Sequence, residues 1–155
     1  MTEAIRQGDI PGVQLRQRVW LAGRTREEAW SWLTEPRLIG SWLADQAVGS
    51  IADGLELRTL GEGGAIVETL RTVAPEDRQH RDRGHRILEL ELRRSDWRVA
   101  TRLTFSLSPD PGGCELSVLH HGFQHLPLSS CLTAWEAYRE RWAAALVRLE
   151  QALRC

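Results

Sequence analysis

The sequence predicts an α+β fold in which a curved antiparallel β-sheet wraps around a long carboxy-terminal helix. Short segments that alternate between apolar and polar residues follow one another from residue 13 to residue 121, with tight turns between them. An apolar stripe with helical spacing then runs through residues 130–153. Strands joined by tight turns are typical of an antiparallel sheet and not of βαβ units.

The length of 155 residues is usual for one domain and is sufficient to bury a substantial core. Residues 1–12 show little pattern, so we expect a loose lead-in there and a single domain over residues 13–155. Apolar residues make up 42% of the chain and charged residues 26%, as in ordinary globular proteins. No apolar run approaches the roughly 18 residues that a membrane-spanning helix needs.

The first strand and two short helices are predicted from local patterns. The segment VQLRQRVWL places one row of residues, with Gln17 among them, on a buried face: Val13, Leu15, Val19 and Leu21. Thr25 and Glu28 have the spacing of a capping box, which opens a helix. Pro36 ends this helix and begins a second one that runs through Trp42.

Six further strands are expected near residues 47–51, 55–60, 65–73, 86–93, 97–107 and 114–121. The segment at 97–107 predicts one inward row: Val99, Thr101, Leu103, Phe105 and Leu107. A run of mixed charges, Pro75–Arg86, separates two of the strands and predicts a solvated loop, because its opposite charges cancel the field that phosphate binding requires.

The closing helix is amphipathic. Its apolar stripe consists of Trp135, Tyr138, Trp142, Leu146, Leu149 and Leu153. Its charged face consists of Glu136, Arg139, Glu140, Arg141, Arg148 and Glu150. A sheet that wraps around such a helix tends to leave space beside the first half of the helix, and this space is the candidate binding site.

Composition excludes several functions. The formal net charge of −1 argues against a general nucleic-acid-binding protein. Every basic residue is arginine, so Schiff-base and lysine-general-base chemistry are excluded. Cys114, Cys131 and Cys155 are sparse and lack metal or disulfide spacing, and the first residues do not have the pattern expected of a signal peptide. This pattern predicts a reduced, cytoplasmic protein.

Four segments resemble, in order and spacing, motifs of the START-like helix-grip superfamily, also called SRPBCC. They are EEAWSWLTEPRLIGSWL, TVAPEDR, GGCELSVLHHGF and RWAAALVRLEQAL, and the resemblance extends from about Val13 to Leu153. Within the superfamily, the chain is most similar to the activator of heat-shock-protein ATPase homologue type. The resemblance implies a helix-grip fold with a cavity for a small apolar or amphipathic molecule, but no single reaction, because relatives include lipid carriers, polyketide cyclases and a co-chaperone domain.

The chain departs from the family at two motif positions. Arg141 replaces the glycine that usually precedes the tryptophan of the closing helix, and Cys114 replaces a usual threonine. These departures leave the implied fold intact, but no ligand preference is carried over from the family.

Three histidines, His120, His121 and His125, lie within six residues, with Cys131 after them. Adjacent strand residues point to opposite faces, so the first two histidines do not converge on one metal ion. We therefore expect no metal site and no cofactor. His120 is the one good candidate for a general base, and no nucleophile-elbow motif accompanies it, so the sequence favours a binding domain over an enzyme.

The alternation along the last strand predicts that His120 points into the cavity and His121 towards solvent. Burial among leucine and tryptophan side chains should favour the neutral imidazole. A neutral, inward histidine either donates or accepts a hydrogen bond with a ligand, or finds its partners within the core, and the sequence leaves both alternatives open.

The predicted ligand-binding residues combine this histidine with inward strand residues and with aromatic residues near the expected opening. They are Trp42, Leu90, Trp97, Val99, Thr101, Leu103, Leu116, Val118, His120, Phe123, Trp135 and Tyr138. The four tryptophan and tyrosine side chains in this set are equally compatible with core packing. Trp30 and Trp142 are expected in the core.

The leading functional hypothesis is binding of a small hydrophobic or amphipathic molecule in the cavity between the sheet and the helix, by a monomer or homodimer. The second is a co-chaperone-like interaction module in the stress response, with a chaperone or another protein as partner. The third is a polyketide-cyclase-like enzyme. Neither nucleic acid nor a membrane span is expected.

Overall fold

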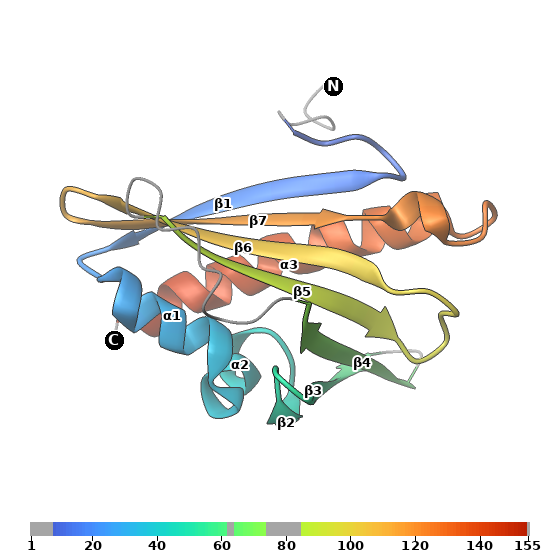
Figure 1. Cartoon of the computed structure of the whole chain (residues 1–155), viewed down its shortest axis with the longest axis horizontal. Coiled ribbons are helices and arrows are strands. Elements are labelled where there is room, and N and C mark those ends of the chain that lie inside the picture. Colours follow the sequence, from blue (N-terminus) through green and yellow to red (C-terminus); the bar gives the residue numbers. More distant parts are fainter. Residues whose placement is uncertain (1–7, 62–63, 74–84, 155) are drawn as a thin grey trace.

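The computed structural model describes residues 8–61, 64–73 and 85–154. Their elements, shown in Figure 1, are β1 (Gln14–Ala22), α1 (Arg26–Thr34), α2 (Pro36–Trp42), β2 (Gln46–Ser50), β3 (Gly54–Gly61), β4 (Gly64–Thr72), β5 (Arg86–Arg94), β6 (Thr101–Asp110), β7 (Gly113–His121), the short 3₁₀ helix η4 (Phe123–His125) and α3 (Cys131–Arg154). None of the described helices has both the length and the apolar character needed to cross a membrane.

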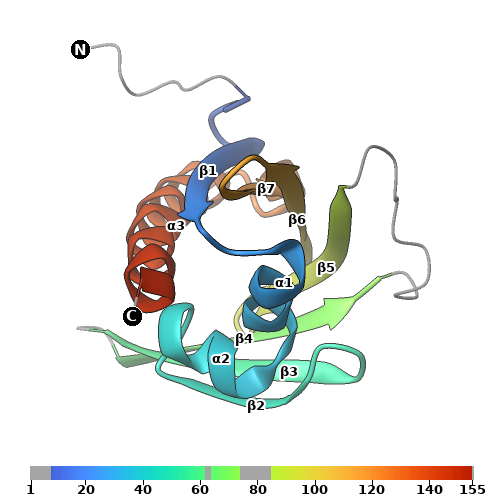
Figure 2. The same cartoon turned by 90° about the vertical axis from the view of Figure 1, so that its left-hand side faces the viewer.

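The strands form one antiparallel sheet in the order β1-β7-β6-β5-β4-β3-β2. Figure 2 shows the sheet curving around α3, with α1 and α2 lying at one end of the sheet. The predicted α+β helix-grip fold is therefore confirmed. The start of α3 and the turn between β5 and β6 lie at the opposite end of the molecule (Figure 1).

The two short helices begin where the local signals predict. Thr25 Oγ1 accepts a hydrogen bond from the Glu28 backbone N–H over 3.1 Å, and Glu28 Oε1 accepts one from the Thr25 backbone N–H over 3.3 Å. This capping box satisfies two donors that the first turn of α1 would otherwise leave free. Pro36 occupies the start of α2, where its missing N–H costs nothing.

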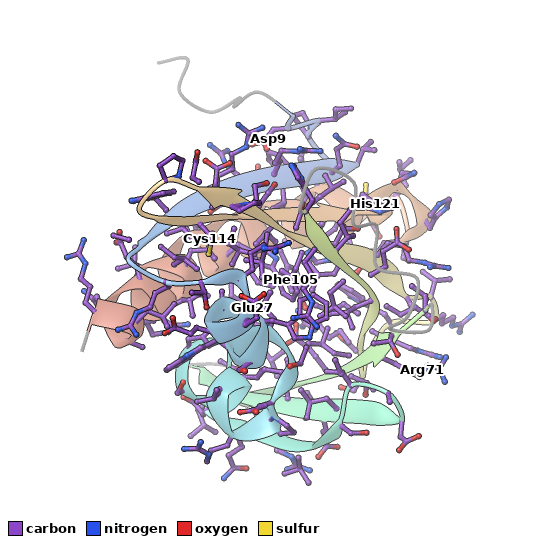
Figure 3. The ribbon with its side chains drawn as sticks, turned by 60° about the vertical axis from the view of Figure 1, so that its left-hand side comes forward. Asp9, Glu27, Arg71, Phe105, Cys114 and His121 are labelled. Atoms are coloured by element: carbon purple, nitrogen blue, oxygen red, sulfur yellow. The ribbon has the colours of Figure 1, made fainter. Side chains whose placement is uncertain are left out.

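Aromatic rings form the centre of the core. The Trp142 ring lies edge-on to Phe105, with 5.8 Å between ring centroids, and 6.4 Å from the ring of Trp42. All three side chains are about 1% exposed. Figure 3 shows Phe105 in the middle of the molecule, between the sheet and the helices. The expected core position of Trp142 is confirmed, and Trp30 is also buried, with the guanidinium of Arg86 stacked over its ring.

The outer edge of β1 is covered by residues 8–13 and by α3. The backbone N–H of Arg16 donates to Asp9 Oδ1 over 2.9 Å, and the Asp9 side chain is almost fully buried beside Arg139. The backbone carbonyl of Gln14 accepts a hydrogen bond of 2.7 Å from the indole of Trp135. These contacts occupy backbone groups that an edge strand would otherwise offer to another chain.

The prediction for the sixth strand was wrong at its beginning. The strand begins at Thr101 and not at Trp97, because the Trp97 backbone N–H donates to the Arg94 carbonyl and closes a turn. Val99 lies in this turn region and is 37% exposed, so it does not belong to the inward row. Most of the predicted charged loop, at residues 74–84, lies outside the described residues.

Candidate functional site

The inward row of β7 contains His120. Cys114, Leu116, Val118 and His120 have no exposed surface, whereas His121 is half-buried. The orientation predicted from the alternation is therefore confirmed for both histidines. Whether His120 binds a ligand is a separate prediction.

Both ring nitrogens of His120 have partners within the protein. The indole Nε1 of Trp142 lies 3.1 Å from Nδ1, and because an indole N–H can only donate, Nδ1 accepts. Nε2 therefore carries the proton and donates to Thr101 Oγ1 over 2.7 Å, while the Thr101 hydroxyl donates to the Leu92 carbonyl over 3.0 Å. A ligand could reach this imidazole only by displacing one of these bonds.

Burial keeps His120 neutral. Desolvation lowers its pKa from 6.5 to about 3, and the positive charge of Arg141 acts in the same direction. The ring of Phe123 lies 4.4 Å away between centroids, and the ring of Tyr138 lies edge-on at 5.0 Å. In this structure the imidazole is thus a neutral, fully bonded member of the core.

A second polar cluster lies between β4 and α3. Glu68 has no exposed surface, and its Oε2 accepts hydrogen bonds from the Tyr138 hydroxyl and from Nη1 of Arg141. The other terminal nitrogen of Arg141, Nη2, donates to the carbonyl of Leu43 over 3.2 Å and to Thr59 Oγ1 over 3.3 Å. Residues from four separate segments therefore meet at one carboxylate and one guanidinium.

The charges of this cluster balance. Burial is the largest single effect and lowers the pKa of Arg141, but the charge of Glu68, the hydrogen bond to it and the contact with Tyr138 together raise it by more, so the pKa lies above its ordinary value. Burial, followed by the charge of Glu68, raises the pKa of Tyr138 far above its ordinary value, so its hydroxyl keeps its proton and donates. The cluster consists of one ion pair and one neutral phenol.

Two atoms of the cluster lack hydrogen-bond partners. Glu68 Oε1 and Arg141 Nε are both buried, and neither has a partner in the described part of the protein. A buried polar atom without a partner costs about 1–3 kcal/mol, so native proteins contain few of them.

Sequence reasoning missed Glu68 and misplaced Arg141. Ile66, Glu68 and Leu70 lie on the same face of β4. Glu68 thus interrupts a row of apolar residues, and this interruption was a usable signal for a buried polar residue. Arg141 was assigned to the solvent face of the closing helix, but its side chain is only 18% exposed and bonds inward. The Glu68 charge that holds it lies far away in the sequence, so helical spacing alone could not reveal this contact.

A surface pocket of about 410 Å³ lies beside the cluster. Its lining comes from the end of β3, the start of β4, and the end of β5 with the two residues after it: Gly61, Gly64, Ala65, Ile66, Val67, Arg94, Ser95 and Asp96. Arg94 is the cross-strand partner of Glu68, and Ile66 precedes Glu68 by two residues on the same strand face. The pocket and the buried carboxylate are therefore neighbours on the sheet.

Most predicted site residues lie in the interior. Leu90, Leu103, Leu116, Val118, Thr101 and Phe123 are at most 1% exposed, whereas Trp97 is half-buried. Five rings form a continuous row along α3, with 5.0–6.4 Å between successive centroids: Trp42, Trp142, His120, Tyr138 and Trp97. Trp135 faces β1 instead, and Val99 is exposed and apart from this row.

Among the described residues, no three histidine, cysteine, aspartate or glutamate side chains are grouped so that they could hold a metal ion.

Comparison with known proteins gives a fold. No family model and no curated protein matches the chain. Protein Ms6760 from Mycobacterium smegmatis has a similar structure, with a TM-score of 0.73, 10% identity, and coverage of 94% of this chain and 93% of that chain. The Aha1 dimer from Colwellia psychrerythraea gives a TM-score of 0.60 at 16% identity, with coverage of 91% and 96%.

DynU16, a protein from the dynemicin biosynthetic locus, gives a TM-score of 0.67 at 15% identity. The match covers 91% of this chain but 47% of that chain. At these identities the likeness shows the fold alone, the α+β helix-grip arrangement described above.

Proposed function

We propose that this protein binds a small amphipathic molecule between the sheet and α3, beside Glu68. The observation that carries the proposal is a fully buried carboxylate with one unpartnered oxygen, next to a surface pocket. A buried ion pair adds little to stability compared with apolar residues of the same volume. The retention of Glu68 and Arg141 in the interior is therefore better explained by recognition of a polar group than by folding.

The pocket suits such a ligand. Its volume of about 410 Å³ lies within the range of roughly 300–1,000 Å³ that is usual for small-molecule sites. Its lining combines the apolar side chains of Ile66 and Val67 with the charged side chains of Arg94 and Asp96. The ligand enters at this pocket and extends towards the rings of Trp97 and Tyr138.

A ligand screen tests the proposal. Native mass spectrometry of freshly purified protein should detect a small molecule that copurifies. In a thermal-shift screen of fatty acids, sterols and aromatic compounds, a ligand at about 100 times its Kd should add about 2.7 kcal/mol, which corresponds to a rise in Tm of roughly 5–10 °C. Indole fluorescence should change in parallel, and Trp97→Phe should reduce this change. Absence of all three signals would contradict the proposal.

The second candidate is a protein-interaction domain of the activator of heat-shock-protein ATPase homologue type, with a chaperone or a second copy as its partner in the cytoplasm. The likeness to the Aha1 dimer supports it. So do Leu128 and Leu132 near the start of α3, which are 93% and 48% exposed. Under this alternative, Leu128→Ser should abolish partner binding or dimerisation in sedimentation experiments, whereas under the first it should leave ligand binding unchanged.

A further inference from the structure

The unpartnered oxygen of Glu68 restricts the chemistry of the ligand. A carboxylate only accepts hydrogen bonds, so Oε1 needs a donor. Oε2 already accepts from Tyr138 and Arg141. An O–H or N–H group on a ligand would satisfy Oε1, whereas an ether or ketone oxygen would leave it without a partner and add a repulsive lone pair.

The charges around Glu68 favour a neutral ligand. Arg141 already balances the carboxylate, and Tyr138 keeps its proton. In the neighbouring pocket, Arg94 Nε lies 2.7 Å from Asp96 Oδ1, so these charges are also paired. A ligand anion would face the lone pairs of Glu68, and a ligand cation would leave a net positive charge in the interior, which is costly.

The aromatic side chains next to Glu68 favour a flat ring. Trp97 and Tyr138 contact each other, with 5.6 Å between ring centroids and 51° between ring planes. Tyr138 is also the residue that donates to Glu68. A ligand group bonded to Oε1 would therefore lie near aromatic rings, which prefer offset or edge-on contact with another ring.

We infer that the ligand is a neutral aromatic compound with a hydroxyl group, a phenol or aryl alcohol, whose O–H donates to Glu68 Oε1. This inference rests on the proposed binding function and specifies its substrate class. The hydroxyl provides the missing donor, the ring lies against Trp97 and Tyr138, and the absence of charge leaves the Glu68–Arg141 pair balanced.

A matched series of probes tests the inference on the unaltered protein. Naphthol, its methyl ether, naphthoate and naphthylmethylammonium share a ring system and differ in donor and charge. Titration by indole fluorescence and calorimetry at neutral pH should show naphthol binding about 10- to 100-fold more tightly than the ether, the range expected for a hydrogen bond to a charged acceptor. Both ions should bind more weakly than naphthol.

The Glu68→Gln variant connects this preference to one residue. It keeps the shape of the side chain and removes the charge, so the preference for naphthol over the ether should fall to a few-fold or less. Glu89→Gln, on the exposed face of β5, is the matched control and should keep the full preference. Circular dichroism checks folding, and if Glu68→Gln does not fold, the probe series on the unaltered protein still decides.

The inference would be overturned by equal binding of naphthol and its ether, by tighter binding of either ion, or by an unchanged preference in folded Glu68→Gln. Binding of fatty acids or sterols without naphthol would also overturn it, while the proposed binding function would stand. If no compound of any class binds, the proposed function itself fails.

Discussion

Trp142 and His120 are joined by a hydrogen bond in which the indole Nε1 donates to the imidazole Nδ1 over 3.1 Å. The bond connects α3 to β7 and, together with Thr101, fixes which ring nitrogen carries the proton. An imidazole that accepts at Nδ1 cannot become protonated there without losing this bond. The hydrogen bonds around His120 therefore favour one protonation state, the neutral imidazole with its proton on Nε2.

The stability of the protein should depend on pH through His120. Its folded-state pKa of about 3 lies below the 6.5 of the unfolded chain, so between these values the unfolded state binds a proton that the folded state does not. Stability is therefore lost as the pH falls below about 6.5, by up to about 1.4 kcal/mol per pH unit. Urea unfolding between pH 7 and pH 4 measures this slope.

The His120→Gln variant separates this contribution from that of the carboxylates. The variant should be less stable at pH 7 but should lose stability less steeply on acidification than the unaltered protein. His125→Gln removes an exposed imidazole and should keep the original slope. Parallel slopes for His120→Gln and the unaltered protein would show that His120 titrates normally.

Removal of the buried cation should be costly. Arg141→Met leaves the Glu68 carboxylate in the interior without its counter-charge, and the expected loss is about 3–5 kcal/mol in urea unfolding. The double variant Glu68→Leu with Arg141→Met should recover much of this loss, because no unpaired charge remains.

The matched control is Arg71→Met. Arg71 pairs with Glu91 over 3.5 Å at the surface, as its position at the margin of Figure 3 illustrates, and its loss should cost about 1 kcal/mol or less. Equal effects of the two arginine substitutions would mean that the interior pair is as hydrated as the surface pair.

Loss of Asp9 should expose the edge of β1. Asp9→Ala removes the acceptor for the Arg16 backbone N–H, and the expected cost is about 1–3 kcal/mol. Hydrogen exchange at the Arg16 amide should accelerate, and aggregation should increase because an open edge can pair with another chain. Asp110→Ala, at the exposed end of β6, should change neither property, and unchanged exchange at Arg16 in Asp9→Ala would refute the protective contact.

Two glycine substitutions should have opposite effects. A Cβ at Gly113 would lie 2.4 Å from the Leu21 carbonyl oxygen, so Gly113→Ala must push β1 and β7 apart and should cost about 1–3 kcal/mol. A Cβ at Gly40, inside α2, would make an ordinary contact of 3.6 Å with Ala47. Gly40→Ala should therefore be neutral or stabilising by roughly 0.4–1 kcal/mol in thermal unfolding, and equal losses would contradict this geometry.

Features that depend on neighbouring residues could be predicted from the sequence. Thr25 and Glu28 cap a helix because their side chains reach backbone groups three residues away. His120 points inward because a strand alternates its faces. Val99 continues the same alternation in the sequence, but the chain turns after Arg94. Val99 therefore lies outside the strand, where the alternation no longer indicates which face a residue occupies.

Features that depend on distant partners could not be predicted. The hydrogen-bond partners of His120 come from β6 and α3, so the choice between a ligand-binding and an internally bonded imidazole stayed open. Glu68 interrupts an apolar row and Arg141 looks like a surface charge, but only the approach of α3 to β4 shows that the two form a buried pair. The spacing of residues along a strand or helix indicates which face a residue occupies, but it does not indicate which charged residue of another element lies opposite that face.

The pairing of β1 with β7 governs the order in which a newly synthesised chain can fold. From β3 to β7 each strand pairs with the one before it, so these hairpins can form as they leave the ribosome. Gln14 pairs with His121, so β1 cannot pair fully with β7 until His121 has been synthesised. Closing so long a loop is slow because conformational entropy is lost before the contact forms. Until β1 pairs with β7, the β7 edge of the sheet is exposed. The β1–β7 pairing is completed only when β7, the last strand, and α3 have been made.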